Sequence, residues 1–174
     1  MTITLDTNCL IDLEEKRNGY VSIEKITNAS KRKKLDVAIV AISAIDKKIH
    51  SNFSEFQQWL ENLGLSHLTI LKPLAYTNIS FVNWCVVGGG ILTELDHKIH
   101  DILFQNLPYS LPSDDLMSKW VNAKADVLIM WAHIWNRREI FITRDKNFLK
   151  DTKKQKLEKL GAGTILTPEE FYKN

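Results

Sequence analysis

Short apolar runs recur along this chain, separated by longer stretches in which apolar residues return with a helical spacing. The clearest run is residues 37–42, Val-Ala-Ile-Val-Ala-Ile, which is apolar on both faces as a central parallel strand must be. Shorter β-rich runs lie at residues 2–5, 68–71, 140–142 and 164–166. Strands that alternate with helices predict an α/β fold, a three-layer α/β/α sandwich with a central parallel sheet.

A long amphipathic helix is predicted directly after residues 37–42. Apolar residues from Ile45 to Leu63 recur at spacings of three and four, which describes one stripe of a helix. Ser43 and Asp46 have the form of a capping box, so we expect the helix to begin there. On this interpretation Asp46 is a first-turn carboxylate that stabilises the helix amino terminus.

Spacing and capping residues indicate the remaining helices. They are predicted over residues 22–34, 77–87, 91–107, 113–136 and 146–160. Gly161 is expected to end the last of these, and Thr167 to Glu170 has the composition of a further helix start. Without internal repeats, the chain is expected to form one domain, residues 1–174, with a longer helical middle segment at about residues 64–113.

Composition excludes several classes of protein. The chain has 174 residues, 44% of them hydrophobic and 25% charged, which is ordinary for a globular domain. Cys9 and Cys85 show no disulfide or zinc-site spacing, which fits a reducing cytoplasm. We expect no signal peptide, because the amino terminus has no basic region followed by an apolar core. We expect no membrane partner, because no apolar run approaches the roughly 20 residues needed to cross a bilayer. A net charge of +2 does not by itself indicate nucleic-acid binding.

Carboxylates follow three of the predicted strands. Asp6, Asp46 and Asp145 each come just after a strand, and the carboxyl ends of parallel strands share one edge of a sheet. Asp126 lies in the predicted helix before the strand at residues 140–142, with apolar residues on both sides, so it is expected to have a partner.

Carboxylates that converge at one edge repel each other, and a bound cation relieves that repulsion. Ligands that are all oxygen select Mg²⁺ or Mn²⁺ rather than zinc. An open carboxylate site with such an ion suits phosphodiester hydrolysis, because the metal activates water and neutralises charge on the phosphate.

Four short motifs in order resemble the PIN domain. They are Asp6-Thr7-Asn8, Ser43-x-x-Asp46, Asp126-x-x-Ile129-x-x-Ala132 and Thr143-Arg144-Asp145-x-Asn147-Phe148. The resemblance covers about residues 1–62 and 119–150, and it implies an α/β/α fold and a divalent-metal-dependent ribonuclease, often the toxin of a bacterial toxin–antitoxin pair. Two positions depart from the family pattern: Asp46 stands where Glu is usual, and Asn147 stands where a fifth acid often lies.

The resemblance assigns a role to each of these residues. Asp6, Asp126 and Asp145 are expected to bind Mg²⁺ or Mn²⁺ directly, and Asp46 directly or through water. Asn8 and Thr143 are expected to orient the carboxylates or the attacking water, and Asn147 is expected to support the site. Arg144 and Lys146 are expected to contact RNA phosphates.

The resemblance implies RNA as substrate and leaves open two further partners, a cognate antitoxin protein and a second copy of the chain. The competing hypothesis is a non-catalytic PIN-like module that binds protein or RNA, which Asp46 and Asn147 favour. A small phosphohydrolase of the haloacid-dehalogenase kind ranks last, because position 8 is Asn where that chemistry needs Asp. His97 and His100 lie three apart, but no third ligand is evident, so a structural or surface role is expected.

Overall fold

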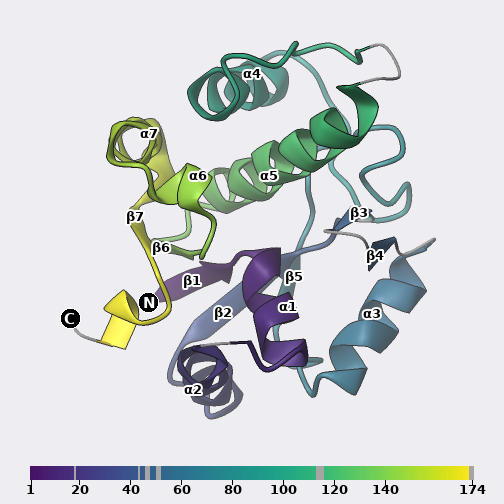
Figure 1. Cartoon of the computed structure of the whole chain (residues 1–174). Coiled ribbons are helices and arrows are strands. Elements are labelled where there is room, and N and C mark those ends of the chain that lie inside the picture. The colour runs from purple at the N-terminus through teal and green to yellow at the C-terminus, as the bar shows by residue number, and fades with distance from the viewer. Residues whose placement is uncertain (18, 43, 46–47, 50–51, 113–115, 173–174) are drawn as a thin grey trace.

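The computed structural model describes residues 1–17, 19–42, 44–45, 48–49, 52–112 and 116–172. Five parallel strands form one sheet in the described residues, and in spatial order they are β5 (Thr69–Leu71), β2 (Asp36–Val40), β1 (Thr2–Leu5), β6 (Ile140–Ile142) and β7 (Thr164–Leu166). The predicted α/β class with a central parallel sheet is confirmed (Figure 1).

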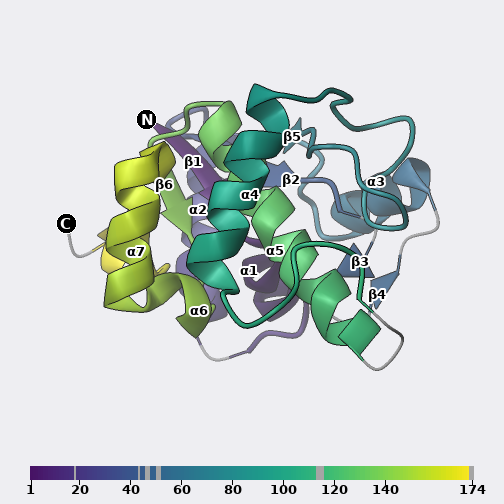
Figure 2. The same cartoon turned by 90° about the horizontal axis from the view of Figure 1, so that it is seen from above.

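Helices cover both faces of the sheet, which gives the three layers (Figure 1). One layer holds α1 (Thr7–Glu14), α2 (Tyr20–Lys31) and α3 (Phe53–Asn62). The other holds α5 (Met117–Trp135), α6 (Lys146–Leu149) and α7 (Asp151–Leu157). Seen from above, α4 (Ile91–Leu103) lies on α5, on the side away from the sheet, as part of the middle segment (Figure 2).

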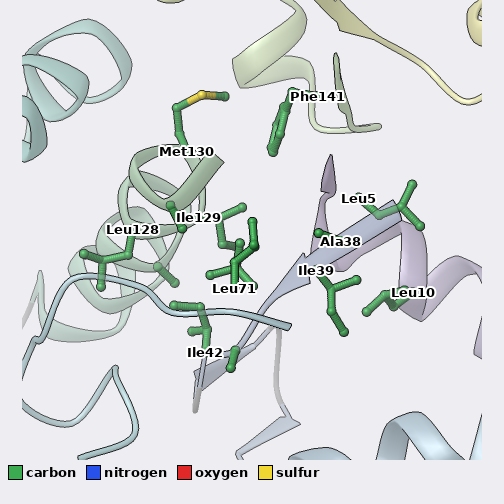
Figure 3. Packing of buried hydrophobic residues seen from close by; sticks show 14 of the residues in the cluster. Leu5, Leu10, Ala38, Ile39, Ile42, Leu71, Leu128, Ile129, Met130 and Phe141 are labelled. Carbon is green, nitrogen blue, oxygen red and sulfur yellow. The ribbon is translucent and has the colours of Figure 1, made fainter. Parts of the chain in front are cut away.

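The core fills the space between these layers with aliphatic side chains. Leu128 and Ile129 of α5 lie on one side of strand β2, and Leu10 of α1 lies on the other (Figure 3). All three are almost fully buried, as is Ile39 of β2. Because β2 is covered on both faces, the apolar sequence from Val37 to Val40 is what its position requires.

The register of β1 against β6 brings two distant parts of the chain to one edge. Leu5 pairs with Ile142, and the next amide, that of Asp6, donates to the Ile142 carbonyl at 2.9 Å. The amide of Thr143 continues the ladder on the other side, to the Leu166 carbonyl at 3.0 Å. Asp6 and Thr143 therefore leave the sheet side by side.

The long helix predicted from Ser43 is wrong. Ala44–Ile45 (β3) and Lys48–Ile49 (β4) form a two-stranded antiparallel ribbon, and α3 begins only at Phe53. The helix starts there because Asn52 is its N-cap, with its side-chain oxygen accepting from the amide of Glu55 at 3.0 Å. Ser43 and Asp46, the expected capping box, lie outside the described residues.

The helix predicted over residues 77–87 is also wrong. This stretch consists of turns and irregular chain, held by a bridge between Leu74 and Val86. Its aromatic residues cover α3 instead: Trp84 stacks on Phe53 with ring centroids 4.4 Å apart, and Phe81 meets the same ring edge-on at 5.8 Å. Apolar composition here reflects individual packing contacts rather than a helical face.

The helix predicted over residues 146–160 is divided. Lys150 has an extended backbone (φ −65°, ψ 118°), which separates α6 from α7. A π-helical turn, η2 (Glu158–Ala162), follows, and Gly161 within it breaks the helical backbone at φ 112°, the left-handed conformation expected of a C-cap glycine. The capping box at Thr167 is confirmed, because its hydroxyl accepts from the amide of Glu170 at 3.2 Å, ahead of η3 (Glu170–Tyr172).

Candidate active site

Two of the predicted carboxylates meet at the carboxyl edge of the sheet. Asp6 follows β1 and is the N-cap of α1, with its Oδ1 accepting from the amide of Thr7 at 2.7 Å. Asp145 follows the neighbouring strand β6 and caps α6, with its Oδ1 accepting from the amide of Asn147 at 2.7 Å. Each capping bond fixes a carboxylate at the start of a helix and at the end of a strand.

Thr143 and Asn8 connect these carboxylates. The Thr143 hydroxyl donates to Asp6 Oδ2 at 2.5 Å and accepts from the amide of Asp145 at 2.9 Å. The Asn8 side-chain amide donates to the same Oδ2 at 2.7 Å, and its oxygen accepts from the amide of Arg144 at 3.3 Å. Both residues thus contact Asp6 in the way that the predicted orienting role requires.

The Asp6 carboxyl group is poorly placed to carry a negative charge. It is 2% exposed, and burial raises its pKa from 3.8 to about 6, with the nearby charge of Asp145 adding to the increase. Hydrogen bonds from Thr143, Thr7 and Asn8 act in the opposite direction and lower the pKa. A bound cation would compensate the charge of Asp145, which lies close to the desolvated carboxylate of Asp6.

This raised pKa predicts a dependence of stability on pH. Between pH 3.8 and about 6 the folded chain holds a proton on Asp6 that the unfolded chain releases. The free energy of unfolding should therefore fall as pH rises through this window, by about 3 kcal/mol from this group alone. Above pH 6, Mn²⁺ should raise the melting temperature, because it binds the ionised folded form.

Thermal unfolding from pH 4 to 7.5 measures this effect in the parent, in Asp6→Asn and in Asp151→Asn. His133 is buried with a pKa lowered by burial to about 4, and it contributes an opposite slope, so the difference between variants is the readout. Asp6→Asn should become relatively more stable as pH rises from 4 to 6, whereas Asp151→Asn, an exposed control, should follow the parent. Identical profiles for the parent and Asp6→Asn would contradict the assignment.

Of the other two expected carboxylates, only Asp126 lies in the part of the chain that the structure describes, and it does not form a metal-binding group with this pair. Asp126 is half-buried on α5, and Asp46 lies outside the described residues. Within the described part of the chain, no three side chains of His, Cys, Asp or Glu lie together as a ready metal-binding group. The geometry thus provides a pair, Asp6 and Asp145, rather than the three direct ligands expected from sequence.

No family model, curated protein or solved structure matches this chain. The site therefore has to be interpreted from its own geometry. Among the helices that the structure describes, none has both the length and the apolar content needed to cross a bilayer.

Arg144 has a different environment from the one expected. Its guanidinium pairs with Asp12 of α1, Nε to Oδ2 at 3.2 Å, and with Glu169 near the carboxyl terminus. Two carboxylates already satisfy its charge, so it ties α1 to the last segment of the chain. Lys146 remains exposed beside Asp145 and is the better candidate for contact with phosphate.

Asn147 has a partner that sequence analysis did not anticipate. Its side-chain oxygen accepts from the ammonium group of Lys153 on α7, which also donates to the main-chain oxygen of Leu103 at the end of α4. Asp145 acts on this ammonium in the direction that raises its pKa, although burial and Lys150 lower it overall. A positive side chain thus lies at the edge of the carboxylate pair.

A buried ion pair lies on the far side of α5 and was also missed. Lys124 Nζ lies 2.6 Å from Asp96 Oδ2, and the two side chains are 0% and 1% exposed. The hydroxyl of Tyr109 donates to the same oxygen at 2.5 Å, while the rings of Tyr76 and Tyr109 face the ammonium at 4.4 Å. The signal was present in sequence, because Asp96 falls four residues after Leu92 and three before Ile99, on the apolar stripe of α4.

The two histidines of α4 lie in different surroundings. His97 Nδ1 lies 3.1 Å from Asp101 Oδ2 on the exposed face. His100 is buried, with its Nε2 3.0 Å from the main-chain oxygen of Leu107.

Proposed function

We propose that this chain is a PIN-like ribonuclease that uses Mg²⁺ or Mn²⁺ to hydrolyse RNA phosphodiester bonds, leaving a 3′-hydroxyl and a 5′-phosphate. The observation that carries the proposal is the pair of carboxylates, Asp6 and Asp145, at the ends of neighbouring strands. One of the two is buried, and its pKa is raised in part by the charge of the other. Such a pair is stabilised by a divalent cation.

The donor set fits a hard cation. Mg²⁺ keeps several of its waters and is held in many phosphate-processing sites by one or two carboxylates together with the substrate phosphate. Asp6 and Asp145 supply those carboxylates, and we propose that Asp126 binds through water and Asp46 directly or through water. When bound, the ion would activate a water molecule and neutralise charge on the phosphate.

The surrounding residues support a fixed site. Asp6 accepts hydrogen bonds from Thr7, Asn8 and Thr143, which leaves its carboxylate one orientation. A preorganised carboxylate needs no rearrangement when the substrate arrives, and this lowers the cost of reaching the transition state. Lys146, exposed next to Asp145, is suited to contact a phosphate of the RNA.

A second candidate function is a non-catalytic module that binds RNA or protein. The lack of a three-acid group among the described residues and the neutral side chain of Asn147 favour it. The first proposal has two extensions. In one, the chain is a toxin with an antitoxin protein as partner, and in the other it associates with a second copy of itself.

Cleavage of RNA in the presence and absence of a chelator tests the proposal. At about 5 mM Mg²⁺ or Mn²⁺, a concentration suited to weakly held ions, the chain should cut single-stranded RNA. EDTA should stop the reaction. The products should accept a labelled nucleotide at a free 3′-hydroxyl. Cleavage that continues in EDTA, or products that end in a cyclic phosphate, would contradict metal-dependent hydrolysis. Binding of RNA without any cleavage would favour the non-catalytic module.

A further inference from the structure

We propose that the ammonium group of Lys153 takes the place of a second divalent cation, so that this site binds one metal ion beside one fixed positive side chain. The inference rests on the proposed function, because it assumes that Asp6 and Asp145 hold a divalent cation. It goes further by fixing the number of ions and by assigning Lys153 as a phosphate-binding residue.

The first support is the position of Lys153. It donates to Asn147 Oδ1, and Asn147 in turn gives its main-chain amide to Asp145 Oδ1 at 2.7 Å. The lysine and the carboxylate are thus joined through one residue, the lysine to its side chain and the carboxylate to its main-chain amide. Burial and the like charge of Lys150 lower the pKa of this ammonium, and the charge of Asp145 acts in the opposite direction.

The second support is the chemistry of Asn147. A second divalent cation would need another anionic oxygen close to Asp145, and an amide supplies no charge. The Asn147 oxygen is moreover already occupied by the lysine. A second ion at this point would meet a positive charge instead of a ligand, and like charges at short range repel each other.

The third support is the way in which Lys153 is held. The main-chain oxygen of Leu103 is at the carboxyl end of α4, where the helix dipole favours a cation. An ammonium has three N–H donors, and within the described residues two of them are engaged, by Asn147 and Leu103. The third is available to an oxygen of the scissile phosphate.

Calorimetric titration of the full chain with Mn²⁺ tests the number of ions, and it does not depend on catalysis. The parent should bind one Mn²⁺ per chain. The double variant Asn147→Asp/Lys153→Met, which replaces the ammonium with a new carboxylate, should bind two. Two ions in the parent, or one ion in the double variant, would overturn this inference and leave the proposed ribonuclease standing. No Mn²⁺ bound by the parent would overturn both.

Cleavage rates test the phosphate role of Lys153. At saturating Mn²⁺, Lys153→Met should lower the rate by about 10- to 100-fold, while Lys153→Arg should retain most of it because the positive charge stays. Lys156→Met is the matched control, an exposed lysine on the same helix, and should cut like the parent. Equal rates for Lys153→Met and Lys156→Met would overturn the role. Far-ultraviolet circular dichroism confirms that each variant is folded.

Discussion

Asp6→Asn and Asp145→Asn should each reduce RNA cleavage at saturating Mg²⁺ by about 100-fold or more. Both changes remove a negative charge from the pair that we propose holds the cation. Asn is still able to cap a helix, so α1 and α6 should keep their N-caps in these variants. Initial rates of cleavage of a single-stranded RNA, measured over a range of Mg²⁺ concentrations, give both the maximal rate and the apparent metal affinity.

The matched control is Asp151→Asn, which removes an exposed carboxylate from the first turn of α7. It should retain the parent rate, because it changes net charge by the same amount at a distance from the pair. If Asp6→Asn and Asp145→Asn cut as fast as Asp151→Asn, the carboxylate pair has no part in catalysis.

Breaking the buried pair between Lys124 and Asp96 should have the largest effect on stability. Asp96→Leu leaves the Lys124 ammonium buried without its counter-ion, and Lys124→Met leaves the carboxylate in the same condition. Each change should lower the free energy of unfolding by about 3–5 kcal/mol. The double variant Asp96→Leu/Lys124→Met should lose much less, because an apolar pair needs no compensation. Urea unfolding of all four proteins measures these differences.

An exposed pair on the same helix provides the control. Lys98 and Glu94 lie 2.6 Å apart on α4, and their side chains are 55% and 61% exposed. Lys98→Met should change the free energy of unfolding by less than about 1 kcal/mol. Two results would show that burial does not control the strength of the Lys124–Asp96 pair. One is a change of less than about 1 kcal/mol in the free energy of unfolding for Lys124→Met as well. The other is a double variant whose loss equals the sum of the losses of the two single variants.

The buried pair of Lys124 and Asp96 also indicates a structural role for the middle segment at about residues 64–113. Asp96 and Tyr109 come from that segment, and Lys124 comes from α5, two residues before Asp126. Trp131 of α5 adds a second link, donating to the main-chain oxygen of Leu92 at 2.9 Å. The segment is therefore packed on α5 as an outer layer, and it stabilises the helix that carries one of the proposed ligands.

Much of the fold was predictable because strand signals are local. The apolar run at residues 37–42, which includes most of β2, indicated a strand buried on both faces, and the abrupt change from Ile142 to Thr143 marked the end of β6. Parallel pairing then places Asp6 and Asp145 at one edge, so the two carboxylates of the site followed from the order of strands and helices alone.

What sequence analysis missed depends on contacts between distant residues or on competing local signals. Lys124 and Asp96 are 28 residues apart, so the position of Asp96 on the apolar stripe of α4 does not by itself identify Lys124 as its partner. At α3, the apolar spacing suited a helix from Ser43, but the Asn52–Glu55 capping box decided the start. Arg144 appeared free for RNA because its partners, Asp12 and Glu169, are far away in the chain.

The most direct test of the central claim is a crystal of the chain soaked in Mn²⁺ and measured at the manganese absorption edge. The account predicts one anomalous peak per chain, bound to oxygens of both Asp6 and Asp145 at about 2.2 Å, close to the distances of Mg²⁺ sites. It also predicts that the peak disappears in Asp145→Asn crystals. Manganese bound elsewhere, or an Asp6–Asp145 pair that stays free of metal at millimolar Mn²⁺, would contradict it.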